Sequence, residues 1–268
     1  MISIESESSK IKLEVVVMIK RIIGVFIPFF IFANLLAQPN PDIYRVMYLK
    51  PKSGSTSQLL AGIKEHNKKH HNKGIMRVRT YRVVSGEKSG WLVRTYGPMS
   101  WAQVDEFVAN SESKAHVDHG AKHIRPNIEE TVGPMYWTPM EDLHYNPSTS
   151  DKPSKMTRVQ FTQLNPGMSG EYYDLRQKYN EVHQKTNSDA SFSMGHLIHG
   201  GQRHAVYATF SRMDSWSNMA PTASTSFSSR YNKVHGNGSW DKFLKQVSKT
   251  IKKSHDEMRV YMKDHSTR

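Results

Sequence analysis

The second half of this chain repeats the first. Residues 63–70 have the character of a helix and end in the pattern [His/Tyr]-Asn-x-x-His, and residues 176–183 do the same. The offset that aligns these two segments also aligns three further pairs, which are Gly54 with Gly167, Val46 with Val159 and Arg45 with Arg158. Self-similarity of this kind predicts two copies of one structural unit. We expect a first repeat over residues 38–145, a linker over 146–155 and a second repeat over 156–268.

Each repeat shows the same succession of hydrophobic patterns. Alternating β-branched and aromatic residues predict four strands per repeat, and apolar residues at helical spacing predict two helices. Each repeat is therefore a β-α-β-β-α-β unit of the ferredoxin-like type. Its helices cover one face of an antiparallel sheet, and the other face needs a partner. We predict an α+β fold in which the two sheets pack into an intramolecular barrel.

This order of elements resembles the dimeric α+β barrel superfamily, which contains antibiotic-biosynthesis-monooxygenase-like and NIPSNAP-type domains. The likeness spans residues 43–264 and would make the chain a tandem fusion that acts as a monomeric pseudo-dimer, with a higher oligomer also open. The resemblance implies binding of small aromatic molecules or haem, and several members are oxygenases. It rests on element order, so it transfers no catalytic residue to this chain.

The N-terminal residues 1–37 have the composition of a secretory signal. An apolar run over residues 22–37 follows Lys20 and Arg21 and ends at Ala37. This order is typical of a cleaved signal peptide, and an uncleaved membrane anchor is the alternative. We expect translation to start at Met18 and the mature protein to be exported, either periplasmic or secreted, with no membrane contact after cleavage.

The repeated Asn and His residues are the first candidates for a site. Asn67 and His70, like Asn180 and His183, are three residues apart and share a helix face, where an amide can fix an imidazole tautomer. His70 and His183 are therefore candidate catalytic or haem-ligating residues. The alternative is that these residues continue the core stripe of Leu59 and Ile63, with His and Tyr closing the helix end by hydrogen bonds to the sheet backbone.

Metal binding, if present, must use histidine. The chain has 14 histidines and no cysteine, which excludes disulfides and thiolate ligands. His116, His119 and His123 can present three nitrogens to zinc if their segment is helical, although Gly120 disfavours a helix. His66 and His70 also have the i, i+4 spacing of a metal pair. The sequence requires no cofactor, and haem and zinc are the candidates.

Arginines on predicted strands form a third candidate set, comprising Arg45, Arg77, Arg79, Arg94 and Arg158. Arg77 and Arg79 are two residues apart and therefore share one face of a strand. If that face looks into the barrel, the arginines line a pocket for a carboxylate or phosphate. If it looks outward, they are solvated surface residues.

Composition bounds the function only loosely. The formal charge of +13 suits a polyanion-binding surface protein, but the basic residues are scattered and predict no specific nucleic-acid site. The P-loop, GxGxxG, Gly-x-Ser-x-Gly and HExxH motifs are absent from the sequence. We therefore expect a barrel that binds a small anionic or aromatic ligand. The alternative is a monooxygenase-like enzyme, cofactor-independent or haem-associated, that uses His70 or His183.

Overall fold

The computed structural model describes residues 42–150, 152–201, 205–220 and 225–268. The predicted signal segment 1–37 and the expected start at Met18 lie outside these residues. Residues 42–268 form one compact unit. In the described part of the chain, no helix combines the length and apolar character needed to cross a membrane.

The first repeat contains four strands and three α-helices. They are β1 (Ile43–Pro51), α2 (Thr56–His70), β2 (Val78–Ser85), β3 (Leu92–Met99), α3 (Trp101–Ser111), α4 (Lys114–His123) and β4 (Ile128–Pro139). Short 3-10 turns are η1 (Gly74–Met76), η2 (Arg125–Asn127) and η3 (Glu141–Leu143).

The second repeat has the same order. It consists of β5 (Met156–Leu164), α5 (Ser169–Lys185), β6 (Ser193–His199), β7 (Val206–Met213), α6 (Phe227–His235), α7 (Ser239–Thr250) and β8 (Ile251–Tyr261). Its 3-10 turns are η4 (Trp216–Met219) and η5 (Lys263–His265). The predicted α+β class and the β-α-β-β-α-β order of both repeats are confirmed.

The eight strands close into one antiparallel barrel in the order β1-β3-β2-β8-β5-β7-β6-β4. The first repeat supplies β4-β1-β3-β2 and the second supplies β8-β5-β7-β6. Two junctions join the repeats, where β2 pairs with β8 and β4 pairs with β6. The inner face that each sheet would expose alone is therefore covered by the other sheet, as the sequence predicts.

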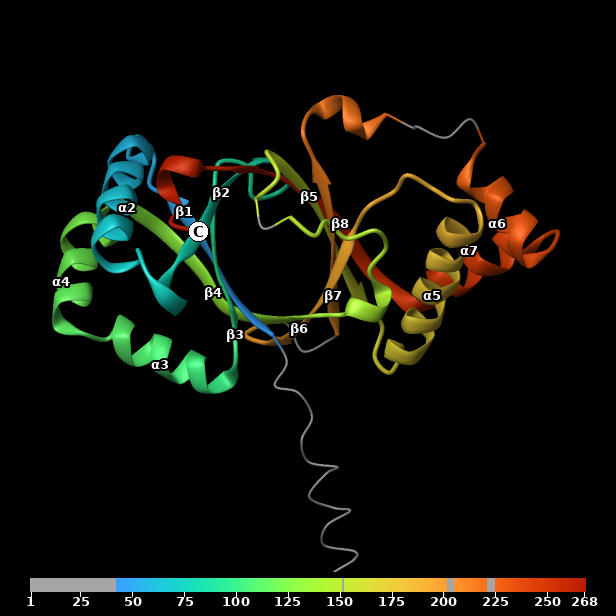
Figure 1. Cartoon of the computed structure of the whole chain (residues 1–268), viewed down its shortest axis with the longest axis horizontal. Helices are drawn as coiled ribbons and strands as arrows, with labels where there is room; N and C mark the ends of the chain where they lie inside the picture. The colour runs from blue at the N-terminus through green and yellow to red at the C-terminus, as the bar shows by residue number, and fades with distance from the viewer. Residues whose placement is uncertain (1–41, 151, 202–204, 221–224) are drawn as a thin grey trace, which may run out of the picture. The chain divides into compact units, whose positions relative to one another are not determined.

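The helices lie outside the barrel in two groups. In Figure 1, α2, α3 and α4 flank the barrel on one side, and α5, α6 and α7 flank it on the other. Successive residues of a strand point to opposite faces, so each strand serves both the interior and a helix layer. On β3, for example, Val93 packs in the barrel interior, whereas Tyr96 contacts Phe107 of α3 at 4.8 Å between ring centroids.

In the described residues, each repeat contains three α-helices where the sequence predicts two. The additional helix of the first repeat is α4, which forms over residues 114–123 despite Gly120. The additional helix of the second repeat is α6, which has only one buried residue, Tyr231.

Candidate functional site

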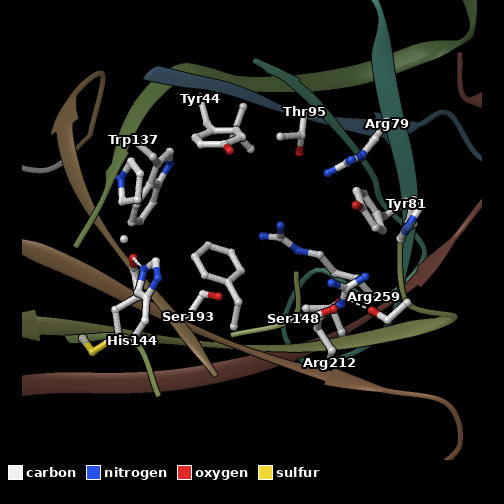
Figure 2. A pocket seen from close by; sticks show the side chains of 18 of the residues that line it. Tyr44, Arg79, Tyr81, Thr95, Trp137, His144, Ser148, Ser193, Arg212 and Arg259 are labelled. Atoms are coloured by element: carbon white, nitrogen blue, oxygen red, sulfur yellow. Dashed lines mark hydrogen bonds between the residues drawn. The ribbon is translucent and has the colours of Figure 1, made fainter. Parts of the chain in front are cut away.

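The barrel encloses a cavity of about 350 Å³. Aromatic side chains from several strands line it on both sides, with Tyr81 beside Arg79 and across from Trp137 (Figure 2). These are Tyr44, Tyr48, Tyr81, Trp137, Phe161 and Phe210. A volume of this size holds a small organic molecule, and the rings offer flat apolar surfaces for it.

The side of the cavity opposite Trp137 is cationic. Arg79 of β2, Arg212 of β7 and Arg259 of β8 lie across the cavity from Trp137 and His144 (Figure 2). Lys152 adds a fourth cation, and the described lining residues include no carboxylate. Guanidinium groups bind carboxylates and phosphates through paired hydrogen bonds. The cavity therefore has three arginines on one side and Trp137 with Tyr44 on the other (Figure 2).

A buried hydrogen-bonded group holds Arg259 in place. The Arg259 Nε donates to Glu257 Oε1 at 2.6 Å, and the Tyr48 hydroxyl donates to the same oxygen at 2.8 Å. Arg259 also donates to the Tyr48 hydroxyl. Burial raises the pKa of Tyr48 above its usual range, partly offset by the positive charge of Arg259. Tyr48 therefore stays protonated and acts as a donor to the carboxylate.

The linker covers part of the cavity. Ser148, Ser150 and Ser154 line it, and Arg212 Nη1 donates to the Ser150 carbonyl at 3.2 Å. Arg212 also donates to the carbonyl of Lys152. The described residues of this segment thus contribute to the wall of the site as well as connecting the repeats.

Of the five arginines predicted to form a pocket, only Arg79 lines this cavity. Arg77 precedes β2, is exposed and donates from Nε to the Thr267 carbonyl at 2.8 Å. The prediction that Arg77 and Arg79 share a strand face is therefore wrong, because the strand begins at Val78.

The other three predicted arginines also serve other contacts. Arg45 stacks over the Phe107 ring of α3 at 5.1 Å, and Arg94 donates to Asn67 of α2. Both side chains therefore face the helix layer. Arg158 forms an ion pair with Asp256 at 2.6 Å.

Arg212 and Arg259 line the cavity but are not among the arginines predicted from the sequence. The signal for Arg259 is the alternation of Glu257, Arg259 and Tyr261 with the apolar Met258 and Val260 along β8. This period of two places the charged pair on one face. The same period places Arg212 on the face of Phe210, and both line the cavity.

Asn67 and Asn180 bond to the backbone and not to an imidazole. Asn67 Nδ2 donates to the His265 carbonyl at 2.7 Å, and Asn180 Nδ2 donates to the Leu143 carbonyl at 2.9 Å. Their proposed role of fixing the tautomer of the neighbouring histidine is therefore wrong. His265 ends η5 of the second repeat, and Leu143 ends η3 of the first, so each asparagine binds the other repeat.

His70 and His183 lie in the helix layers, and neither lines the barrel cavity. His183 is 4% exposed, and neither ring nitrogen has a hydrogen-bond partner among the described residues. It packs against the rings of Tyr179 and Phe227, with centroid distances of 4.8 and 5.2 Å, and lines a separate cavity with Arg230. Burial lowers the pKa of His183 to about 4, with Arg230 and Arg176 adding to the shift.

Five histidines of the first repeat gather in one cluster outside the barrel cavity. His116 and His119 of α4 face His66 of α2, with nitrogen–nitrogen distances of 3.1 Å to each. Burial lowers the pKa of His116 to about 4, and it lowers the pKa of His66 further. These rings are therefore neutral at physiological pH, the state in which imidazole ligates a metal. His70 and His71 join the same cluster.

Comparison with solved structures supports the barrel fold. An anthrone oxidase-like protein superposes with a TM-score of 0.51 and 10% identity, over 84% of this chain and 92% of its own. A candidate chlorite dismutase superposes with a TM-score of 0.50 and 8% identity, over 84% of this chain and 96% of its own. Both have the dimeric α+β barrel fold, and at this identity the likeness concerns the fold alone. No protein-family model and no curated protein sequence matches the chain.

Proposed function

We propose that the barrel cavity binds a small molecule that carries both an aromatic ring and an acid group. The observation behind this proposal is the division of the cavity into a wall with Arg79, Arg212 and Arg259 and a wall with Trp137 and Tyr44 (Figure 2). An acid group at the arginines leaves the ring against Trp137. The described lining residues contain no carboxylate, and the buried Glu257 behind this wall is already paired with Arg259.

The experiment compares aromatic carboxylic acids with their neutral amides by isothermal titration calorimetry at low ionic strength. Each amide keeps the ring and the size of the acid but lacks its charge. We expect the acid to bind at least tenfold more tightly, equivalent to about 1.4 kcal/mol. Equal affinity for acid and amide would remove the basis for an anion-binding wall.

Catalysis on such a ligand is a separate proposal. The neighbours' names concern oxidase and dismutase reactions, and those activities belong to those proteins. The earlier assignment of a base to His70 or His183 receives no support, because neither residue lines the cavity. An oxygenase-like reaction here would instead use groups at the cavity, such as His144 or Tyr48. Oxygen consumption in the presence of a bound acid tests it.

We also propose that the chain is an exported tandem fusion that works as a monomer. The apolar run over residues 22–37 after Lys20 and Arg21 supports export. The closure of one barrel from two repeats in a single chain supports the fusion, because a second chain is not needed to cover either sheet.

A further inference from the structure

Five histidines from two helices meet in the helix layer of the first repeat, outside the barrel cavity. His66 and His70 belong to α2, His71 follows it directly, and His116 and His119 belong to α4. The ring centroid of His66 lies 4.5 to 5.1 Å from the centroids of the other four. The i, i+4 spacing on α2 and the i, i+3 spacing on α4 give each helix one histidine-bearing face.

Three Nε2 atoms converge within this cluster. The Nε2 of His116 lies 3.1 Å from the Nε2 of His66 and 3.2 Å from the Nε2 of His71. Ligand nitrogens bound tetrahedrally at the usual zinc distance are about 3.3 Å apart. The two separations from His116 are therefore close to those around a bound zinc ion. One atom from each of the three residues lies within 4.8 Å of the other two.

The hydrogen bonding of His71 sets its tautomer for ligation. Its Nδ1 lies 2.9 Å from the Met76 carbonyl oxygen, which can only accept. Nδ1 therefore carries the proton, and in the neutral ring Nε2 presents its lone pair to the cluster. Metal-ligating histidines commonly donate their other N–H to a backbone carbonyl in this way.

Hydrogen bonds among the three rings alone cannot pair all of their Nε2 atoms well. The Nε2 of His116 faces two other ring nitrogens and can carry one proton at most. A cation that accepts all three lone pairs removes that conflict. Imidazole nitrogen suits zinc and its neighbours in the first transition series, and the chain has no thiolate to compete.

We propose that His66, His71 and His116 bind one zinc ion that links α2 to α4, with water or hydroxide in the fourth position. The nearby Arg94 donates to Asn67, the residue after His66, and its positive charge favours hydroxide there. This site is independent of the ligand proposed for the barrel.

Gly62 permits the close approach of the helices that carry this site, whereas a Cβ on Gly120 would make an ordinary contact. A Cβ on Gly120 of α4 would lie 3.8 Å from the His66 ring, and a Cβ on Gly62 of α2 would lie 2.1 Å from the His123 carbonyl oxygen. The second distance leaves no room for a side chain. The contact between α2 and α4 is therefore made by the same two helices that carry the histidines.

The test uses the full chain, stripped with a chelator and titrated with Zn²⁺ alone by calorimetry, and with Co²⁺ by visible absorption. We expect one ion per chain and a Co²⁺ spectrum of four-coordinate type. His116→Gln should weaken zinc binding at least 100-fold while circular dichroism stays unchanged, because His116 is only half-buried. His71→Gln should do the same, with its fold checked in parallel.

Matched controls come from the two other groups of side chains that could hold an ion. These are His66 with His70 and His119, and Glu65 with His119 and His123. His70→Gln and His123→Gln should keep zinc affinity within about threefold of the unsubstituted chain. The proposal is overturned if the folded chain takes up no zinc. It is also overturned if either control abolishes binding while His116→Gln leaves it intact.

Discussion

Asn67 and Asn180 act at the scale of single residues to join the two repeats. Each sits on the first helix of its repeat and donates to a backbone carbonyl just beyond the last strand of the other repeat. Asn67 also accepts a hydrogen bond from the buried Arg94. Removal of the Asn67 side chain therefore takes away an acceptor of the charged Arg94, while the His265 carbonyl keeps its hydrogen bond from Thr80 Oγ1. Asn180 serves one carbonyl.

We accordingly predict that Asn67→Ala lowers the free energy of unfolding by about 2 to 3 kcal/mol, since it breaks a bond to a charged group. Asn180→Ala should cost about 1 kcal/mol. Urea denaturation followed by circular dichroism measures both. A larger loss for Asn180→Ala than for Asn67→Ala would contradict this account.

His183 should make stability depend on pH. Its pKa falls from an ordinary 6.5 to about 4 in the folded chain, so folding favours the neutral ring. The contribution of neutral His183 to the free energy of unfolding is fully present above pH 6.5. It is lost as the pH falls towards 4, and the loss reaches about 3 kcal/mol. His183→Phe retains an aromatic ring without a titrating group. We predict that the variant loses less stability over this range.

Urea denaturation at a series of pH values measures this difference. The other buried histidines are common to both proteins, so their contribution cancels in the comparison. Parallel pH profiles for the two proteins would show that His183 does not titrate in this window.

At the residue scale, the sequence predicts the cavity only in part. The two-residue period correctly relates neighbours within a strand, but it does not say where the strand starts. Because β2 begins at Val78, Arg79 lies on the strand and lines the cavity, whereas Arg77 does not. Arg212 and Arg259 also line the cavity, because strands from the second repeat complete the same wall. That proximity depends on barrel closure, which no local pattern contains.

At the scale of elements, the lack of a side chain at Gly62 allows α2 to pack closely against α4. A Cβ at this position would overlap the His123 carbonyl oxygen, which belongs to the backbone and cannot rotate away. Gly170 on α5 is the matched control, because nothing lies within 4 Å of a Cβ there. Alanine is the better helix former at either position by about 1 kcal/mol.

We predict opposite signs for the two substitutions. Gly170→Ala should raise the free energy of unfolding by up to about 1 kcal/mol. Gly62→Ala should lower it by about 1 to 3 kcal/mol, because overpacking outweighs the gain in helix propensity. Thermal and urea denaturation measure both. Stabilisation by Gly62→Ala would mean that α2 and α4 are not in close contact.

Element order is the best-predicted property of this chain, and the reason is the duplication. Two copies of one pattern allow a weak strand or helix signal in one repeat to be checked against the other. Helix α4 was less certain, because Gly120 lowers its local propensity. A Cβ on Gly120 would lie 3.8 Å from the His66 ring, an ordinary van der Waals contact, so the packing does not require glycine at that position.

At the scale of the whole molecule, the barrel makes the two repeats interdependent. Each repeat contributes four neighbouring strands, and the interior lies between them. Separation of the repeats would break the β2–β8 and β4–β6 pairings and expose the inner face of both sheets. We predict a single cooperative thermal transition for the folded unit.

Scanning calorimetry tests this prediction when the calorimetric enthalpy is compared with the van't Hoff enthalpy. The two should agree for a single unit of folding. Two resolved transitions would indicate that each repeat is stable without the other.

The central claim is that the barrel cavity binds an aromatic acid through its arginine wall. The most direct measurement is calorimetric titration of one such acid into the unsubstituted chain, Arg79→Gln and Arg77→Gln. Arg79 lines the cavity, whereas Arg77, two residues away, is exposed outside it. Arg79→Gln should weaken binding at least tenfold, and Arg77→Gln should leave it unchanged. Equal affinities for all three proteins would contradict the claim.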